Sequence, residues 1–361
     1  MICTNQLREI RGSELVTLEL AEHFLARGAT VDVANNLFLP PMSSEFAGLA
    51  GQGRLFVADD PYHDFPGPYD LIWIQHSLLP PSIIELMAAG GSHSAVVWHH
   101  MSAQIHMELP ILNDVEEAVA DVSTAVSREV ADLLHGFGLS RRRISLFDNP
   151  APDGFADAVR RRTSTSLDRL LVVSNHPPDE VLGAAALLRN RDGLQVDVLG
   201  ELTTVTRVTP QVLDEYDAVL TIGKTVQYAL SIGLPCYVYD HFGGSGWLTA
   251  ANFEDERRWN FSGRASRRQT DASTIADELV AGFSSARDYA VTRRADNADR
   301  WRLSARLDGL MRSRAFHRPS NKRLSRSQAD RLLAFNELHR GMYRTLEYYK
   351  DELARLGASG F

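Results

Sequence analysis

The stretch that decides the fold is Asp217–Asp240, which reads DAVLTIGKTVQYALSIGLPCYVYD. Two short apolar runs, at 218–221 and 236–239, flank a segment at 224–232 whose apolar residues recur at helical spacing. Short apolar runs that alternate with helices are typical of βαβ units, in which parallel strands lie buried beneath the helices. The stretch therefore predicts a parallel sheet with helices packed on its faces.

The same alternation extends over most of the chain and falls into two blocks. In the first block, we expect strands at 1–4, 30–34, 55–58, 70–75, 94–98 and 122–125, with helices at 14–27, 81–89 and 111–118. In the second block, we expect strands at 170–174, 194–199, 218–221 and 236–239, with helices at 178–189, 210–215 and 224–232. An Asn- and Pro-containing segment at 149–154 separates the blocks. The sequence thus predicts an α/β protein with two Rossmann-like domains, residues 1–155 and 156–315, and a helical tail, residues 316–361.

The composition is that of a globular protein. Of the 361 residues, 44% are hydrophobic and 23% are charged, which excludes a disordered or low-complexity chain. The two cysteines are too few for a disulfide framework or a zinc cluster. No apolar run approaches the roughly 20 residues of a membrane span, and we expect no secretory signal. These features predict a cytoplasmic protein.

The charge is unevenly distributed along the chain. Residues 287–361 carry 17 Lys and Arg against 9 Asp and Glu, a charge of +8, so the remainder carries −16 within a formal total of −8. A body this acidic argues against a nucleic-acid partner, and we expect membrane contact to be at most peripheral. The basic tail has two explanations: it contacts phosphate or an anionic membrane, or it is a solvated helix docked on its own acidic body.

Polar residues and glycines follow three strands of the second block. Ligands of doubly wound sheets bind beyond the carboxyl ends of the strands, so these positions predict a binding site. They are Asn175, His176, Gly223, Lys224, Thr225, Asp240, His241, Gly243, Gly244 and Ser245. We expect the glycines at 243–246 to form a loop that closes on the ligand, because glycine permits close backbone approach. A merely flexible turn is the alternative.

Lys224 is the only lysine among the first 321 residues, and it opens a predicted helix. A helix N-terminus favours an anion, so we expect Lys224 to contact a phosphate; a surface lysine is the alternative. The segment is not a P-loop, because the first glycine of that pattern would fall at Ala218. Farther along, Glu254–Glu256 is expected to be a solvated acidic turn.

Several segments, taken in their order along residues 1–285, resemble GT-B glycosyltransferases, especially the bacterial family 4-like group. The resemblance is carried by a first loop and helix (12–31), two histidine-bearing strands (70–77 and 96–100), the approach to the linker (126–127 and 144–150), a helix of the second domain (228–235) and the motif Asn260–Arg264. Their order along the chain is the stronger signal, because no single match is decisive.

The resemblance implies two Rossmann-like domains that face each other across a cleft. It implies a glycosyltransferase that moves a sugar directly from a nucleotide-diphosphate sugar to a glycan or glycoconjugate acceptor, as in polysaccharide biosynthesis, with retention and without a metal or other cofactor. Gly12, Ser13 and Glu14 would form the acceptor-side loop, and the strand-end residues of the second domain would bind the nucleotide sugar. His100 and His76 would line the sugar site or transfer a proton.

These histidines also have a structural alternative, because a histidine near a core is often a satisfied packing residue. Strand alternation points His99 and His100 to opposite faces of their sheet. A metal site at His99, His100 and His106 is not expected, since no Cys or carboxylate stands at ligand spacing.

Two departures from the family pattern keep other functions open. The glutamate pair that is usual in the sugar-nucleotide site would fall at Leu220 and Tyr228, and Asn175–Pro178 stands where an Arg and a Lys are usual. Lys224 would supply the missing positive charge. The alternatives are a non-catalytic GT-B-like binding protein and a GT-B-fold sugar-nucleotide epimerase. The sequence does not determine the base, the sugar or the acceptor.

The tail carries a heptad pattern of apolar residues. Its members are Leu332, Phe335, His339, Met342, Leu346, Tyr349, Leu353 and Leu356. Such a seam predicts a helix of about 30 residues that pairs with a partner helix, with Ser327 and Asp330 as its capping box and Gly357 at its end. We therefore expect a homodimer held by this helix and made pH-sensitive by His339. The alternative is a helix that packs on its own N-terminal domain.

Overall fold

The computed structural model describes residues 1–49, 51, 54–105, 108–201, 203–313, 316 and 321–356. The chain divides into two compact units, which we call unit 1 (Met1–Val126, Val130–Leu146 and Arg312–Phe361) and unit 2 (Ser127–Glu129 and Phe147–Met311). The predicted domain boundaries lay after residues 155 and 315, whereas the chain leaves unit 1 near Leu146 and returns to it at Arg312. The helical tail therefore belongs to unit 1.

Unit 1 is built on a parallel sheet with the strand order β3-β2-β1-β4-β5-β6-β7. Its strands are β1 (Ile2–Cys3), β2 (Val31–Ala34), β3 (Leu55–Ala58), β4 (Leu71–Gln75), β5 (Ala95–His100), β6 (Val122–Ala125) and β7 (Ile144–Leu146). Its helices are α1 (Gly12–Ala26), α2 (Met42–Ala47), α3 (Pro81–Ala89), α4 (Asn113–Val119), α5 (Arg128–Gly136) and α14 (Arg326–Arg355). The predicted alternation is confirmed, and β7 adds an edge strand that the sequence prediction did not include.

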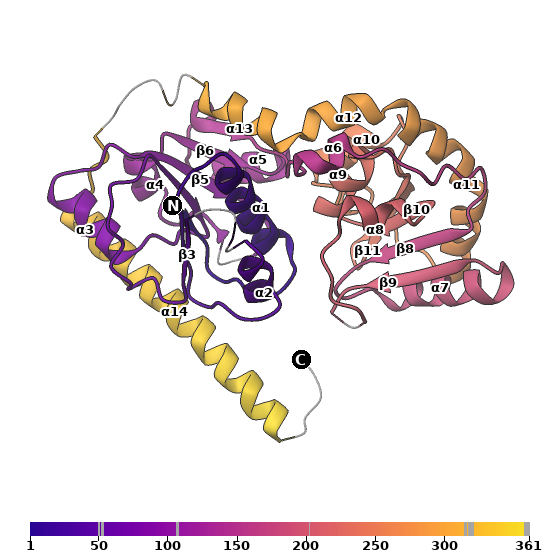
Figure 1. The fold of residues 1–361 in the computed structure, drawn as a ribbon, viewed down its shortest axis with the longest axis horizontal. Coiled ribbons are helices and arrows are strands. Elements are labelled where there is room, and N and C mark those ends of the chain that lie inside the picture. The colour runs from indigo at the N-terminus through magenta and orange to yellow at the C-terminus, as the bar shows by residue number, and fades with distance from the viewer. Residues whose placement is uncertain are drawn as a thin grey trace. The chain divides into compact units, whose positions relative to one another are not determined.

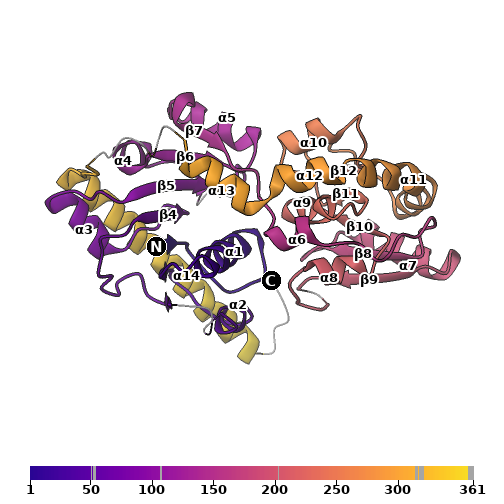
Figure 2. The same ribbon diagram turned by 45° about the horizontal axis from the view of Figure 1, so that its top comes forward.

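Different helices cover the two faces of this sheet. On one face, Ile74 and Trp98 are buried in a core completed by residues of α3, α4 and α14. Figures 1 and 2 both show α14, in yellow, running beside α3. On the other face, Gln75 Nε2 donates to Thr17 Oγ1 of α1 at 3.2 Å. Strand alternation thus sends successive side chains of β4 and β5 into two different environments.

Unit 2 repeats the doubly wound arrangement with the strand order β12-β11-β10-β8-β9. Its strands are β8 (Arg169–Val173), β9 (Gln195–Leu199), β10 (Ala218–Thr221), β11 (Cys236–Asp240) and β12 (Gly243–Trp247). Its helices are α6 (Asp153–Asp157), α7 (Asp179–Arg191), α8 (Pro210–Asp214), α9 (Lys224–Ser231), α10 (Phe253–Arg258), α11 (Ala272–Thr292), α12 (Arg294–Trp301) and α13 (Leu303–Met311). Figure 1 shows α7 and α11 side by side, and both contribute to one core with β8 and β10.

Strand β12 corrects a prediction, because the glycines at 243–246 were expected to form a loop. Gly243–Trp247 instead pairs antiparallel with β11, and Trp247 lies opposite Tyr237. Gly244 permits this pairing, because a Cβ there would lie 1.9 Å from the Val238 carbonyl oxygen. The glycine-rich composition therefore serves close packing of main chains at a sheet edge, which a sequence pattern cannot distinguish from a flexible turn.

Helix α14 begins with a capping box that differs from the predicted one. The Gln328 N–H donates to Ser325 Oγ at 3.2 Å, and the Ser325 N–H donates to Gln328 Oε1 at 3.0 Å. Ser327 and Asp330, the predicted pair, lie inside the helix. Gly357, its predicted end, lies outside the described residues.

The predicted heptad seam of α14 does not face in one direction. Leu332 and His339 are buried against unit 1, whereas Met342, Leu346 and Tyr349 are exposed. A seam with a period of 3.5 residues drifts around a straight helix of 3.6 residues per turn, so its two ends point different ways. The alternative, that the tail packs on its own N-terminal domain, holds for one face of α14: Ala329 and Leu332 join the core of unit 1, and farther along Arg344 pairs with Asp60 and Glu347 with Arg8.

Candidate functional site

The carboxyl ends of β1 and β4 bring Thr4, Asn5 and His76 together in unit 1. His76 has φ 55°, a backbone conformation that side chains other than glycine seldom adopt. Its Nδ1 accepts the Asn5 main-chain N–H at 3.3 Å and lies 3.2 Å from Thr4 Oγ1. A main-chain N–H can only donate, so the neutral ring carries its proton on Nε2, which lies 3.4 Å from Glu108 Oε1. His76 is therefore held in one orientation and one tautomer.

Glu14, on the first turn of α1, is fully buried beside this histidine. Ser13 Oγ donates to Glu14 Oε2 at 2.6 Å, and Gln6 Nε2 donates to Glu14 Oε1 at 3.3 Å. Burial raises the pKa of the Glu14 carboxyl, and the Ser13 hydrogen bond and the charge of His76 oppose that rise more weakly. The structure thus places the predicted acceptor-side residues and His76 in one neighbourhood. Gly12 starts the helix that carries them.

Two residues of α14 complete this cluster, and the sequence analysis missed their role. His339 is buried rather than part of an exposed seam, and it contacts Phe335 with a centroid separation of 4.0 Å. Burial, helped by the charge of His76, lowers its pKa to about 4. Burial also raises the pKa of Tyr343 to about 12, with smaller effects from Glu108 and Glu14. Spacing alone could not reveal that α14 returns to this sheet.

The second predicted catalytic histidine, His100, lies in a different environment. Its Nε2 is 3.0 Å and 3.1 Å from the two carboxylate oxygens of Glu116 on α4, and Ser123 Oγ donates to the same carboxylate. His99, as the alternation predicts, points the other way, where its Nδ1 is 2.8 Å from Thr124 Oγ1. Both histidines are buried. His100 is thus held by core partners, which the sequence could not show because Glu116 is 16 residues away.

In unit 2, Gly223, Lys224 and Thr225 lie where α9 begins, as predicted. Gly223 has φ 60°, and its N–H donates to the Phe261 carbonyl at 3.0 Å. The Lys224 side chain turns inward instead of remaining on the surface. It is buried, and its Nζ donates to the Pro150 carbonyl at 2.8 Å. The structure therefore assigns Lys224 a structural contact that the sequence did not predict, and its contact with a diphosphate stays a prediction.

Leu220 and Tyr228, where the usual glutamate pair would fall, are both core residues. Each is only 1% exposed. The Tyr228 ring stacks on Phe155 with centroids 4.3 Å apart, and Lys224 Nζ lies 5.2 Å from the same ring. These two positions therefore contribute packing rather than charge.

The end of β11 carries Asp240 and His241 next to the glycine-rich strand. Asp240 is buried, and its Oδ1 accepts the His241 N–H at 2.7 Å and lies 3.3 Å from His241 Nδ1. His241 is exposed, and its ring lies 4.0 Å from that of Phe242. Gly243 packs so closely that a Cβ would lie 2.4 Å from the Arg268 carbonyl oxygen. This edge combines a fixed carboxylate, an exposed imidazole and bare main chain.

Asn175 and His176 follow β8 at the same edge of the sheet. The His176 side chain is exposed, and its Nε2 lies 3.6 Å from Glu201 Oε2. The main chain here approaches that of β9 closely, because a Cβ on Gly200 would lie 1.9 Å from the Ser174 carbonyl oxygen. The predicted residues after β8, β10 and β11 therefore share the carboxyl edge of one parallel sheet.

Glu256 is a further candidate, and here the sequence interpretation was wrong. It was taken as part of a solvated acidic turn, but it is 1% exposed on α10. Burial raises the pKa of its carboxyl, while the nearby Ser245 hydroxyl and Gly263 N–H act in the opposite direction. Glu256 and Ser245 line a cavity of about 330 Å³. Three adjacent acidic residues are typical of a solvated turn, so the sequence did not indicate that one of them, Glu256, is a buried carboxyl beside the glycine-rich strand.

Neither a metal cluster nor a membrane span is found in the described part of the chain. Within it, no group of three His, Cys, Asp or Glu side chains is arranged to hold a metal ion. His106, considered in the sequence analysis, lies outside the described residues. The described helices include none that is both long enough and apolar enough to cross a membrane.

Comparison with known proteins identifies the fold. No protein-family model and no curated protein sequence matches the chain. Among solved structures, Anabaena HepE in complex with UDP is similar over 86% of this chain and 97% of HepE, with a TM-score of 0.50 and 13% identity. The apo form of the lipopolysaccharide outer core galactosyltransferase WaaB matches over 88% of this chain and 99% of its own, with a TM-score of 0.47 and 13% identity. Together with the two doubly wound sheets, the match to HepE shows that this chain has the GT-B fold, as the sequence resemblance implied.

Proposed function

We propose that this protein is a glycosyltransferase that uses a nucleotide-diphosphate sugar, with UDP as the first nucleotide to test. The single observation that carries the proposal is the fold shared with HepE over 97% of that protein, whose crystal structure holds UDP. We further propose a glycan or glycoconjugate acceptor, as in polysaccharide biosynthesis. The transfer is direct and retaining, and it needs neither a metal nor another cofactor.

In this proposal the carboxyl edge of the unit 2 sheet binds the nucleotide sugar. The first N–H groups of a helix have no intrahelical acceptor, so the start of α9 at Lys224 offers donors to a diphosphate. Asn175, His176, Asp240 and His241 lie at the same edge and would contact the rest of the nucleotide. Fixed N–H donors stabilise the charge that develops on a leaving diphosphate, which is how such a site works without a metal.

The acceptor, in turn, is assigned to unit 1 at the cluster around His76. Since the His76 ring carries its proton on Nε2 and its Nδ1 accepts the Asn5 N–H, the ring would orient the Glu108 carboxylate, and that carboxylate would receive the proton of an acceptor hydroxyl. Glu14 is fully buried and its two oxygens accept hydrogen bonds from Ser13 and Gln6, so it would hold the acceptor-side loop in place, while the more exposed Gly12 and Ser13 would meet the acceptor. We assign the proton transfer to the His76–Glu108 pair rather than to His100, because Glu116 already holds His100 in the core.

The experiment that tests this proposal is a thermal-shift panel of UDP, GDP, TDP and CMP, followed by turnover of the corresponding sugar nucleotides with and without glycan acceptors. We expect UDP to stabilise the protein and sugar release to depend on an acceptor. Stabilisation by none of the four nucleotides would overturn the proposal in favour of a non-catalytic protein. Turnover of the sugar nucleotide without any acceptor would instead indicate an epimerase.

We also propose that the protein is a homodimer whose two copies meet through the outer face of α14. Leu338, Met342, Leu346 and Tyr349 expose between 47% and 61% of their surface along this face. Gly341 lies among them, and a Cβ there would meet nothing within 4 Å. Glycine inside a helix costs about 1 kcal/mol relative to alanine, and no contact with a residue that the structure describes requires a glycine at position 341. A second helix that packs closely against this position would require one.

The chemistry of this face favours a second copy over a membrane or a nucleic acid. Residues 337–356 carry four Lys and Arg and four Asp and Glu, so no net charge attracts an anionic surface. In an antiparallel pair centred between Tyr343 and Arg344, each Leu338 would lie opposite the partner's Tyr349. The small residues Gly341 and Thr345 would then lie near the crossing point. An isologous contact of this kind is the commonest form of dimer.

Light scattering at micromolar concentration tests the dimer. We expect a dimer for the intact chain and a monomer for Met342→Glu, while Val280→Glu, at an exposed site on α11, stays dimeric. A point variant is preferable to truncation at Arg326, because Ala329 and Leu332 belong to the core of unit 1. An intact chain that is monomeric would rule the dimer out.

A further inference from the structure

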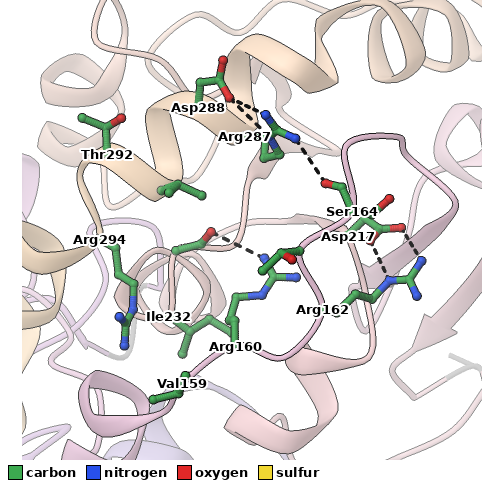
Figure 3. Close-up of a pocket in the computed structure, with 13 residues that line it drawn as sticks. Val159, Arg160, Arg162, Ser164, Asp217, Ile232, Arg287, Asp288, Thr292 and Arg294 are labelled. Carbon is green, nitrogen blue, oxygen red and sulfur yellow. Dashed lines mark hydrogen bonds and ion pairs between the residues drawn. The ribbon is translucent and has the colours of Figure 1, made fainter.

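Unit 2 contains an arginine-lined pocket at the edge of its sheet opposite the proposed nucleotide-sugar site. The pocket has a volume of about 620 Å³ and is formed by the segment 159–164, by Asp217 and Gly233, and by residues 287–294 of α11 and α12 (Figure 3). Asp217 directly precedes β10, and Gly233 lies just before β11. These are the amino ends of the strands, whereas Asp240 and Asn175 follow carboxyl ends.

Two of the four arginines in this pocket have carboxylate partners. Arg162 binds Asp217 through two hydrogen bonds of 2.6 Å and 2.9 Å, and the main-chain N–H groups of residues 168 and 169 bind the same carboxylate. Arg287 donates to Asp288 Oδ1 at 2.8 Å and lies along the opposite wall (Figure 3). Since the Asp288 side chain is 64% exposed, its pair with Arg287 is the looser of the two.

The other two arginines are held by main-chain carbonyls. Arg160 donates to the Tyr216 carbonyl at 2.6 Å and to the Gly233 carbonyl at 3.5 Å, and Arg294 donates to the Ala158 carbonyl at 2.5 Å. Within the described residues, neither has a carboxylate at ion-pair distance, and the Nε–H of each is buried without an acceptor. Burial lowers the pKa of the Arg160 guanidinium, which is the expected effect of removing a cation from water. Neither guanidinium is therefore paired directly with a carboxylate in the described part of the chain, and Asp214 and Asp217 act on Arg160 only from a greater distance.

The charge balance of the lining indicates the ligand. The lining contains four arginines and the two aspartates Asp217 and Asp288, so its net charge is +2, although residues 1–286 as a whole are acidic. A phosphate monoester carries about −1.5 to −2 at pH 7, whereas a carboxylate carries −1. Guanidinium groups also match phosphate oxygens in geometry, because they present parallel N–H donors. A dianionic phosphate therefore fits this pocket better than a carboxylate.

One wall of the pocket is apolar, which indicates that the part of the ligand beyond its phosphate is apolar too. Val159, Ile232 and Val291 line it beside the arginines. Figure 3 shows Arg160 reaching into the middle of the lining residues, with Ile232 and Val159 along its base. We infer that this pocket binds a small organic phosphate whose phosphoryl group contacts Arg160, Arg287 and Arg294 and whose apolar body packs on Val159, Ile232 and Val291. The ligand joins the segment 159–164 to α11 and α12, so it stabilises unit 2 independently of the nucleotide site.

Isothermal titration with phenyl phosphate tests the inference, because this probe joins a dianion to an apolar ring. The titration is performed with UDP present in excess, so that a phosphate occupying the nucleotide site does not contribute. We expect saturable binding with one molecule per chain. Phenol and inorganic phosphate each lack one half of the contacts and should bind at least tenfold more weakly. Benzoate, a monoanion with the same ring, should also bind at least tenfold more weakly.

Arg287→Gln and Arg294→Gln should each weaken phenyl phosphate binding at least tenfold and leave UDP binding unchanged. Arg293→Gln is the matched control, because Arg293 is exposed outside the pocket and pairs with Asp296 at 2.9 Å. Arg294 covers Gly233, so circular dichroism checks that its variant is folded, and Arg287 provides a second variant at a more open position. Absence of phenyl phosphate binding, equal binding of benzoate, or undiminished binding by the folded variants would each overturn the assignment.

Discussion

The carboxyl edges of the two sheets are built differently, although both sheets are doubly wound. In unit 1, ionisable side chains from three separated parts of the chain lie together: Glu14 and His339 are buried, and the His76 side chain beside them is 7% exposed. In unit 2, the corresponding edge is dense in main chain, and Gly243 and Gly244 leave no room for a Cβ. The carboxyl edge of the unit 1 sheet holds titratable side chains in place. The carboxyl edge of the unit 2 sheet exposes main chain that a ligand can approach closely.

This difference suggests a division of labour between the units. Buried acids and histidines have shifted pKa values because the low dielectric disfavours their charged forms, and proton transfer uses such groups. Main-chain N–H groups carry no titratable proton and present fixed dipoles, which suits a phosphate. The proposed assignment of the acceptor to unit 1 and of the nucleotide to unit 2 follows this contrast. The following variants test it, from the largest expected effect to the smallest.

Replacing Gly244 by alanine should have the largest effect. The new Cβ would lie 1.9 Å from the Val238 carbonyl oxygen, so β12 must separate from β11. We expect a loss of about 3 kcal/mol or more in the free energy of unfolding, or no folded protein. Gly12→Ala, where a Cβ meets nothing within 4 Å, should change stability by less than about 1 kcal/mol in the same denaturant titration. A stable Gly244 variant with weakened UDP binding would restore the flexible-loop interpretation.

His76→Asn should be next, with an effect on catalysis rather than on folding. Asn tolerates the left-handed backbone at this position and can accept the Asn5 N–H, but it removes Nε2. We expect kcat to fall about 100-fold while the KM for the sugar nucleotide is unchanged. His100→Asn serves as the comparison and should reduce stability more than kcat. If the two variants behave alike, proton transfer does not belong to the His76–Glu108 pair.

Lys224→Met should lower stability, because it leaves the Pro150 carbonyl buried without its donor. The expected loss is about 1–3 kcal/mol in the free energy of unfolding. The apolar stem of Met preserves packing against Tyr228, so the change isolates the ammonium group. Affinity for UDP, measured where the variant is folded, provides the second readout. A large loss of UDP affinity would show that Lys224 contacts the diphosphate as well.

Smaller effects are expected on the pH dependence of stability, and the first of them comes from His339. Its pKa is lowered from 6.5 to about 4 in the folded protein, so between these values the unfolded chain binds a proton that the folded chain does not. Stability from this group is present above pH 6.5 and is lost as the pH falls towards 4. We expect His339→Gln to remove about 1–2 kcal/mol of this loss. His93→Gln, at an exposed position, should leave the profile unchanged.

Glu14 should act in the opposite direction within the same cluster. Its pKa is raised by burial, so its contribution to stability is present below the ordinary value of 4.5 and is lost as the pH rises through the raised value. Glu14→Gln keeps the shape and removes this titration. Unfolding curves of the Glu14→Gln variant and of the unsubstituted chain at about pH 5 and about pH 8 should therefore differ most at the higher pH. Equal differences at both values would show that Glu14 is ionised in the folded protein.

Most of the fold could be predicted from local patterns. The bounds of β3, α3, β6 and β10 agree with the expected ranges, because buried parallel strands and amphipathic helices leave periodic signals in adjacent residues. The order of the family-like segments along the chain also indicated the GT-B fold, which the match to HepE confirms. Strand alternation correctly separated His99 from His100.

The sequence alone determined the elements, their order and the positions of residues that follow each strand, since these depend on neighbours within a few residues. Only the tertiary structure decided which partners those residues meet. In the folded chain, Lys224 donates to the Pro150 carbonyl, and His100 lies against Glu116. Gly243–Trp247 forms a strand, and His339 lies near His76. Each of these depends on contacts between distant parts of the chain, whose burial and pairing energies leave no periodic trace in the sequence.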